Sequence, residues 1–181
     1  GLNEAAIRSF AADGVKLLFT VDCGTTNVTQ IELAASLGID VIVVDHHEPP
    51  GRLPPAYAMI NPKLSGSTYP FTGICSVGIS FKVAWALSKG LTQSSKLSGR
   101  FREFLLDAMG YVALGTVADV CPLVDENRVF VKYGLSALSN GTAPGLKALL
   151  EKARLSEKKI DAFAVGFRLA PRLNAAGRME S

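Results

Sequence analysis

The chain has 181 residues, of which 48% are hydrophobic and 19% are charged, and its formal net charge is +3 at pH 7. This length suits one domain, or one domain and part of another, with enough apolar residues for a sizeable core. The composition argues against a membrane protein or a secreted one, because no stretch approaches ~18 uninterrupted apolar residues and no secretion signal opens the chain.

Charge distribution and cysteine usage narrow the class of protein further. Residues 147–181 hold eight Lys and Arg against four Asp and Glu. Such a basic end suits phosphate backbones, but it equally suits a solvated helical face. Cys23, Cys75 and Cys121 lie far apart and form no C-x-x-C pair. This spacing argues against a disulfide framework or a zinc site, and it predicts a protein of the reducing cytoplasm.

The beginning of the chain predicts a βαβ unit. Residues 2–12 carry apolar side chains at helical spacing, and residues 16–21 form a short apolar run that predicts a buried strand. A second helix ends near Gly38, and the β-branched run at 41–44 is typical of a strand buried on both faces. A helix that leads into the first buried parallel strand implies a further strand upstream. We therefore expect an α/β domain that lacks its first strand.

The rest of the chain is predicted to be mostly helical. One more short strand is expected at 56–60, closed by Asn61-Pro62 and followed by a polar loop at 63–72. The spacing of apolar residues then predicts helices at 77–88, 101–119, 126–139, 144–153 and 157–168.

Polar side chains follow the first two predicted strands. Asp22 comes directly after one strand, and Asp45, His46 and His47 come after the next. Neighbouring strands lie about 4.8 Å apart, so these side chains share one edge of the sheet and come within reach of a common metal ion. A single Asp at this place is more often a turn residue, and a single surface His is unremarkable. The convergence of four such residues favours a functional site.

Asp119 and Cys23 are two further residues that could carry chemistry. Asp119 stands in an otherwise apolar stretch, where a carboxylate is rare unless it is paired or binds a metal. The alternative is the end of a helix that faces water. Cys23 follows Asp22 at a strand end, where a packed thiol is a better interpretation than a nucleophile.

Three motifs resemble the second, third and fourth signatures of the DHH phosphoesterase superfamily. They are Thr20-Val21-Asp22-Cys23-Gly24, Val44-Asp45-His46-His47 and Leu114-Gly115-Thr116-Val117-Ala118-Asp119. Within the superfamily, Ile60-Asn61-Pro62 and the segment Pro171-Arg172-Leu173-Asn174-Ala175-Ala176-Gly177-Arg178 resemble the RecJ family of bacterial exonucleases specific for single-stranded DNA.

The resemblance implies a fold and a domain organisation. The expected fold is a three-layer α/β/α domain with a mainly parallel sheet, spanning residues 1–168, without its first strand and first motif. Residues 101–168 of this domain would be mostly helical. Residues 169–181 would begin a linker helix to a C-terminal lobe that the chain does not include.

The resemblance also implies roles for individual residues. Asp22 would bridge two metal ions, and His46 and Asp119 would both bind one of them. His47 would contact the scissile phosphate, and Asp45 would orient an imidazole from behind. The expected substrate-binding residues are Arg172, Asn174 and Arg178.

The activity implied is metal-dependent hydrolysis of phosphodiesters by a 5′→3′ exodeoxyribonuclease of DNA repair and recombination. It would use two divalent ions, Mn²⁺ by preference with Mg²⁺ as the alternative, and release mononucleotides from single-stranded DNA. The protein would be a cytoplasmic monomer that works with helicases or single-strand-binding proteins. The segment in hand is expected to be inactive alone.

Three alternatives remain open from the sequence. One is a DHH hydrolase of short oligonucleotides, cyclic dinucleotides or pyrophosphate, which the segment at 171–178 argues against. The second is a non-catalytic DNA-binding relative, which would have no physical need for Asp22, His46, His47 and Asp119 together. The third is a flavodoxin-like signalling fold without a metal.

Overall fold

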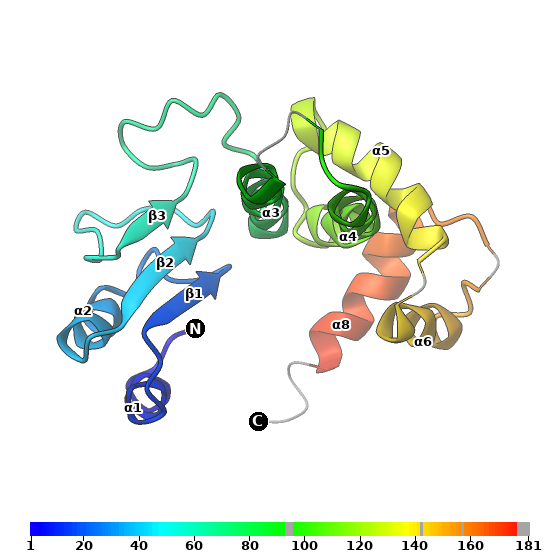
Figure 1. Ribbon diagram of the computed structural model, residues 1–181. Helices are drawn as coiled ribbons and strands as arrows, with labels where there is room; N and C mark the ends of the chain where they lie inside the picture. Colours follow the sequence, from blue (N-terminus) through cyan, green and yellow to red (C-terminus); the bar gives the residue numbers. More distant parts are fainter. Residues whose placement is uncertain (93–95, 142, 157, 177–181) are drawn as a thin grey trace. The chain divides into compact units, whose positions relative to one another are not determined.

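The computed structural model describes residues 1–92, 96–141, 143–156 and 158–176, which form two compact units (Figure 1). The first unit is Gly1–Ser80, and the second begins at Phe81. The division falls within the helix α3 (Ser76–Thr92).

A three-stranded parallel sheet is the centre of the first unit (Figure 1). Its strands in spatial order are β1 (Leu17–Val21), β2 (Asp40–Val44) and β3 (Ala58–Ile60). Val44 at the end of β2 pairs with both Val21 and Ile60, so the three strands end at one edge. The predicted α/β class and parallel sheet are confirmed, and the loops that follow the strands start side by side.

Two helices cover one face of this sheet. The first, α1 (Glu4–Ala12), begins where the Asn3 side chain accepts a hydrogen bond from the Ala6 N–H at 2.8 Å. The second, α2 (Val28–Ser36), ends two residues before Gly38, whose φ of +73° suits a helix terminus. The core they form consists of Ile7, Ile31, Ala34, Ile39, Val41 and Val43, all buried. Each large side chain buried here contributes about 1.5–3 kcal/mol.

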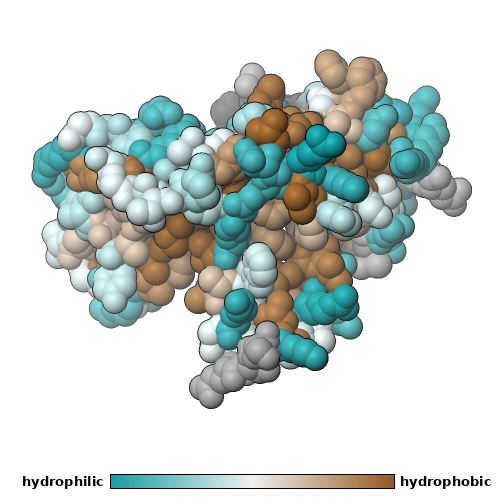
Figure 2. All heavy atoms as spheres, turned by 90° about the horizontal axis from the view of Figure 1, so that it is seen from above, coloured by the Kyte–Doolittle hydropathy of each residue, from teal (hydrophilic) through white to brown (hydrophobic). Residues whose placement is uncertain are grey.

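The opposite side of β1 is much more open. Leu17, Phe19 and Val21 are 49%, 47% and 50% exposed. The burial predicted for this strand is therefore wrong for these three residues, because α1 and α2 pack on the other face and β1 is the edge strand of the described sheet. Figure 2 shows one face of the molecule, on which apolar side chains reach the surface among polar ones.

The second unit is helical. After the end of α3, its elements are α4 (Gly99–Ala118), α5 (Asp125–Ser139), α6 (Pro144–Lys152), α7 (Ala162–Ala164), the π-helical turn η1 (Val165–Leu169) and α8 (Ala170–Ala176). A buried cluster that includes Leu114, Leu138, Val165 and Leu169 links α4, α5 and η1. No helix within the described ranges is long and apolar enough to cross a membrane.

One predicted helix differs from the structure. The sequence predicted a helix over 157–168, but α7 begins only at Ala162. The reason is a cap: the Asp161 carboxylate accepts a hydrogen bond from the Ala164 N–H at 2.7 Å, which fixes the helix start there. The helix then continues through η1 into α8. The predicted domain boundary after residue 168 stays a prediction.

Gly24 is expected to tolerate no side chain. Its φ is +117°, and a Cβ atom there would lie 2.5 Å from Thr20 Oγ1 and 3.0 Å from Val43 Cγ1. We predict that Gly24→Ala lowers the free energy of unfolding by more than about 2 kcal/mol, measured by urea denaturation. The matched control is Gly14→Ala, at φ +77° with nothing within 4 Å, which is expected to cost about 1 kcal/mol. Equal costs for the two variants would contradict this explanation.

Candidate metal centre

Asp22 lies directly after β1 in a left-handed backbone conformation, with φ +62°. Its N–H donates to the Val44 carbonyl at 3.0 Å, so the sheet ladder holds its backbone in place. Asp tolerates this conformation better than most residues, although it still costs free energy relative to the common regions. The side chain is 64% exposed and therefore accessible to a ligand.

Asp45 follows β2 and is only 1% exposed. One carboxylate oxygen accepts the N–H of Thr25 at 3.0 Å. The other accepts the N–H groups of His46 and His47, at 2.8 and 3.3 Å, and the His47 ring Nδ1 at 2.7 Å. Both oxygens are therefore used within the protein. This arrangement suits a residue that orients its neighbours rather than one that binds a metal directly.

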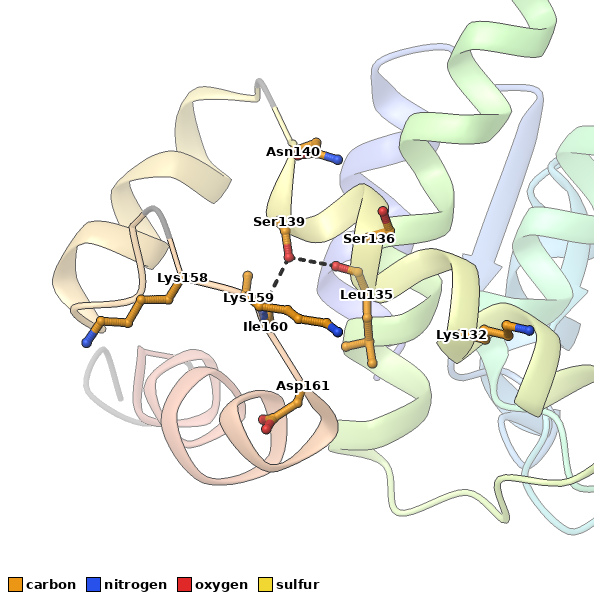
Figure 3. Close-up of a pocket in the computed structure, with 9 residues that line it drawn as sticks. All are labelled: Lys132, Leu135, Ser136, Ser139, Asn140, Lys158, Lys159, Ile160 and Asp161. Atoms are coloured by element: carbon orange, nitrogen blue, oxygen red, sulfur yellow. Dashed lines mark hydrogen bonds between the residues drawn. The ribbon is translucent and has the colours of Figure 1, made fainter.

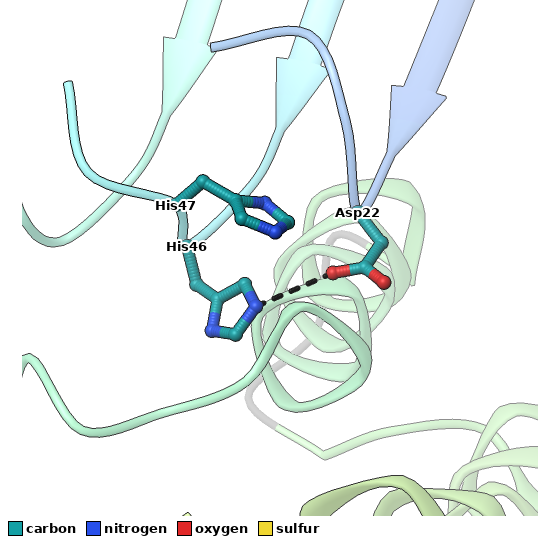
Figure 4. A group of neighbouring side chains, drawn as sticks. All are labelled: Asp22, His46 and His47. Carbon is teal, nitrogen blue, oxygen red and sulfur yellow. Dashed lines mark ion pairs between the residues drawn. The ribbon is translucent and has the colours of Figure 1, made fainter. Parts of the chain in front are cut away.

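His46 and His47 lie in the loop after β2, directly after Asp45, and project toward Asp22 (Figure 4). The His46 Nε2 atom is 3.4 Å from Asp22 Oδ1. Ligand atoms of Asp22, His46 and His47 all lie within 4.8 Å of one another. Because the ionised Asp45 carboxylate can only accept, His47 donates from Nδ1, and Nε2 of the neutral ring then carries the lone pair.

The donor set fits a divalent ion. Two atoms that bind one ion at about 2.1 Å lie about 3.0–3.4 Å apart, which matches the separation of His46 Nε2 and Asp22 Oδ1. Asp22 and His46 would hold the ion, and a mixed carboxylate and imidazole shell suits Mn²⁺.

Comparison with known proteins identifies the family of this chain. The family model for the DHH family, N-terminal domain, matches residues 3–116. The chain belongs to the DHH family. The resemblance to the RecJ family that the sequence indicated is confirmed as well. A single-stranded-DNA-specific exonuclease RecJ of Bacillus subtilis (strain 168) is 42% identical over 180 residues, which are 99% of this chain and 21% of the relative.

Solved structures match almost the whole of this DHH chain. RecJ of Thermus thermophilus in complex with Mn²⁺ has a TM-score of 0.81 and 32% identity, covering 99% of this chain and 25% of that one. RecJ of the same organism in complex with Mg²⁺ has a TM-score of 0.59 and 26% identity, covering 97% and 28%. The chain thus spans about a fifth to a quarter of the length of these relatives.

The surroundings of Cys23 argue against a nucleophile in this DHH domain. Burial raises the pKa of its thiol, and the nearby carboxylates of Asp45 and Asp22 raise it further. A raised pKa leaves little thiolate at neutral pH, which supports the interpretation of a packed thiol.

Asp119 lies in the second unit as the C-cap of α4, and it is exposed. Its N–H donates to the Gly115 carbonyl at 2.9 Å, and the Cys121 thiol lies 3.4 Å from its carboxylate. A carboxylate is unfavourable at a helix C-terminus. Val120 beside it has φ +56° and is 88% exposed, a costly conformation for a β-branched residue. A carboxylate at a helix C-terminus followed by a strained backbone conformation is typical of a functional position.

The predicted substrate-binding residues belong to the end of the chain. Arg172 and Asn174 are exposed on α8, and the Arg172 guanidinium donates to the Arg168 carbonyl one turn earlier. Arg178 lies outside the described residues. Their contact with DNA stays a prediction.

A surface pocket of about 610 Å³ lies elsewhere, in the second unit (Figure 3). It is lined mainly by α5 and by residues 158–161, among them Lys132, Lys159 and Asp161. Among the described lining residues Asp161 is the only carboxylate, and one of its oxygens caps α7. This described lining offers no group of metal ligands.

Sequence reasoning missed two residues behind the site, Thr25 and Asn61. Thr25 is fully buried and bonded to Asp45, and Asn61 is 5% exposed and bonded to Thr25 and His47. The available signal for Asn61 is its place directly after the predicted strand at 56–60, within the motif Ile60-Asn61-Pro62.

The pKa of Asp45 predicts a specific pH dependence of stability. Burial alone raises this pKa, but hydrogen bonds from the His47 ring and from Thr25 outweigh burial and lower it from 3.8 to about 2. A carboxyl whose pKa is lower in the folded state stabilises the fold above its unfolded pKa and loses that contribution as pH falls through the folded value. At neutral pH the contribution is about 2–3 kcal/mol.

We predict that Asp45→Asn is less stable than the wild type at pH 7, and that the difference shrinks between about pH 4 and pH 2. Urea denaturation of both proteins at several pH values measures this difference in the free energy of unfolding. Other carboxyl groups affect both proteins alike, so the difference isolates Asp45. A difference that stays constant down to pH 2 would show that the carboxylate is not held in this way.

Proposed function

We propose that the protein carrying this chain is a metal-dependent exonuclease that degrades single-stranded DNA from its 5′ end and releases mononucleotides. The observation that carries the proposal is the approach of His46 Nε2 to Asp22 Oδ1 at 3.4 Å, with His47 beside them. The Bacillus subtilis relative supplies the substrate class, since it is a single-stranded-DNA-specific exonuclease. The activity is proposed for the full-length protein, because the chain spans 21% of the first relative.

The proposal gives each residue a task. Asp22 would hold both of two divalent ions, and His46 and Asp119 would hold one of the two. His47 contacts the scissile phosphate and stabilises the charge that develops on it, while Asp45 holds the His47 ring through Nδ1. When bound, such ions supply positive charge for the attacking and leaving oxygens of an in-line displacement.

The substrate of the full-length protein is a single DNA strand. Arg172, Asn174 and Arg178 contact the DNA strand from the linker that begins after residue 168. A channel too narrow for two strands excludes duplex DNA. The bases of the bound single strand stack on aromatic side chains in this channel. Mn²⁺ is the preferred ion, with Mg²⁺ as the alternative. The protein acts in the cytoplasm as a monomer, beside helicases or single-strand-binding proteins, in repair and recombination.

Substitution of Asp22 tests this function. In the full-length protein with saturating Mn²⁺, Asp22→Ala is expected to lower the release of mononucleotides from single-stranded DNA by at least about 10³-fold, because both ions lose a ligand. The matched control is Asp40→Ala, which removes an exposed carboxylate at the opposite end of β2 and should leave activity unchanged. An Asp22→Ala enzyme as active as the control would refute the metal assignment.

The choice of substrate distinguishes this function from that of small-molecule relatives. A long single strand should be degraded with a higher kcat/KM than a dinucleotide, since it also contacts the linker residues. The reverse order would favour a hydrolase of short oligonucleotides.

A further inference from the structure

Asn61 stands directly after β3 and is 5% exposed, yet nothing in the proposed chemistry uses it. Its amide donates from Nδ2 to the His47 carbonyl at 2.9 Å and to Thr25 Oγ1 at 3.1 Å. Its Oδ1 accepts the Lys63 N–H at 2.9 Å. The orientation of the amide is fixed chemically, because a carbonyl can only accept and a backbone N–H can only donate.

These bonds join the loops after all three strands. Thr25 lies in the loop after β1, His47 after β2 and Asn61 after β3. Thr25 also donates its N–H to the Asp45 carboxylate at 3.0 Å. His47 is thus held at two points, by Asp45 at its ring and N–H and by Asn61 at its carbonyl.

We propose that Asn61 is a positioning residue that fixes the backbone of the His46–His47 loop relative to Asp22. The inference rests on the proposed function only for its catalytic consequence. Asp45 holds the ring and the N–H of His47, and Lys63 Nζ pairs with the Glu48 carboxylate at 2.8 Å, but neither contact fixes the peptide plane between His47 and Glu48, which can still rotate. The bond from Asn61 to the His47 carbonyl removes this freedom and keeps both imidazoles facing Asp22.

A buried amide with both donors and its acceptor satisfied is costly to replace. Asn61→Ala leaves the His47 carbonyl and the Thr25 hydroxyl without this donor. A loss of stability alone would not distinguish positioning from ordinary packing. The matched control is therefore Ile31→Ala, a fully buried side chain of α2 in the same unit, which lowers stability without removing any of these hydrogen bonds.

The first measurement is independent of activity. Hydrogen exchange of the His46, His47 and Thr25 amides, the three that bond to Asp45, is measured in the full-length protein. The exchange rates are compared after correction for the global stability of each variant. We then expect Asn61→Ala to speed the exchange of these three amides at least about 10-fold more than Ile31→Ala does. Equal exchange in the two variants would overturn the inference. Thr25→Val, which keeps the bond from Asn61 to the His47 carbonyl, should give an intermediate effect.

The second measurement is kinetic. With saturating Mn²⁺, Asn61→Ala should lower kcat on single-stranded DNA about 10–100-fold with KM changed less than about 3-fold, whereas Ile31→Ala should leave kcat within about 3-fold. An unchanged kcat would overturn the catalytic part of the inference. If the wild type itself shows no metal-dependent hydrolysis, the proposed function fails, and the exchange experiment still decides the role of Asn61.

Discussion

Four hydrogen bonds to one buried carboxylate, that of Asp45, hold the candidate metal centre together. An ionised carboxyl group at 1% exposure would be strongly unfavourable without such partners. Because its partners come from the loops after β1 and β2, the charge is stable only when both loops take their observed conformations. The buried charge therefore links the geometry of the site to the stability of the fold.

Local backbone strain occurs in both units, at Asp22 in the first and beside Asp119 in the second. Asp22 has a left-handed backbone conformation, and so does Val120 beside Asp119. Neither conformation is required by a buried side chain, since Asp22 is 64% exposed and Val120 is 88% exposed. Conformations of this kind persist where the surrounding structure fixes them, and they concentrate at functional sites. The strain at these two positions supports the roles proposed for the carboxylates of Asp22 and Asp119.

Much of this arrangement was predictable from the sequence. The run at 41–44 and the polar residues after it indicated the strand and its site, because burial on both faces and a polar end produce a distinctive pattern. The half-exposed face of β1 was not predictable, since an apolar run does not show which neighbours cover it. The start of α7 at Ala162 depended on the cap at Asp161, which competes with the apolar spacing that extended the predicted helix. The roles of Thr25 and Asn61 were missed because they depend on contacts between loops far apart in sequence.

The central claim is that Asp22 and His46 bind the same metal ion. Crystals of the full-length protein grown with Mn²⁺ and measured for anomalous scattering at the manganese edge would test it most directly. The account predicts an anomalous peak about 2.0–2.3 Å from both the Asp22 carboxylate and His46 Nε2, with the Asp119 carboxylate bound to the same ion. Manganese bound elsewhere, with Asp22 and His46 left uncoordinated, would contradict it.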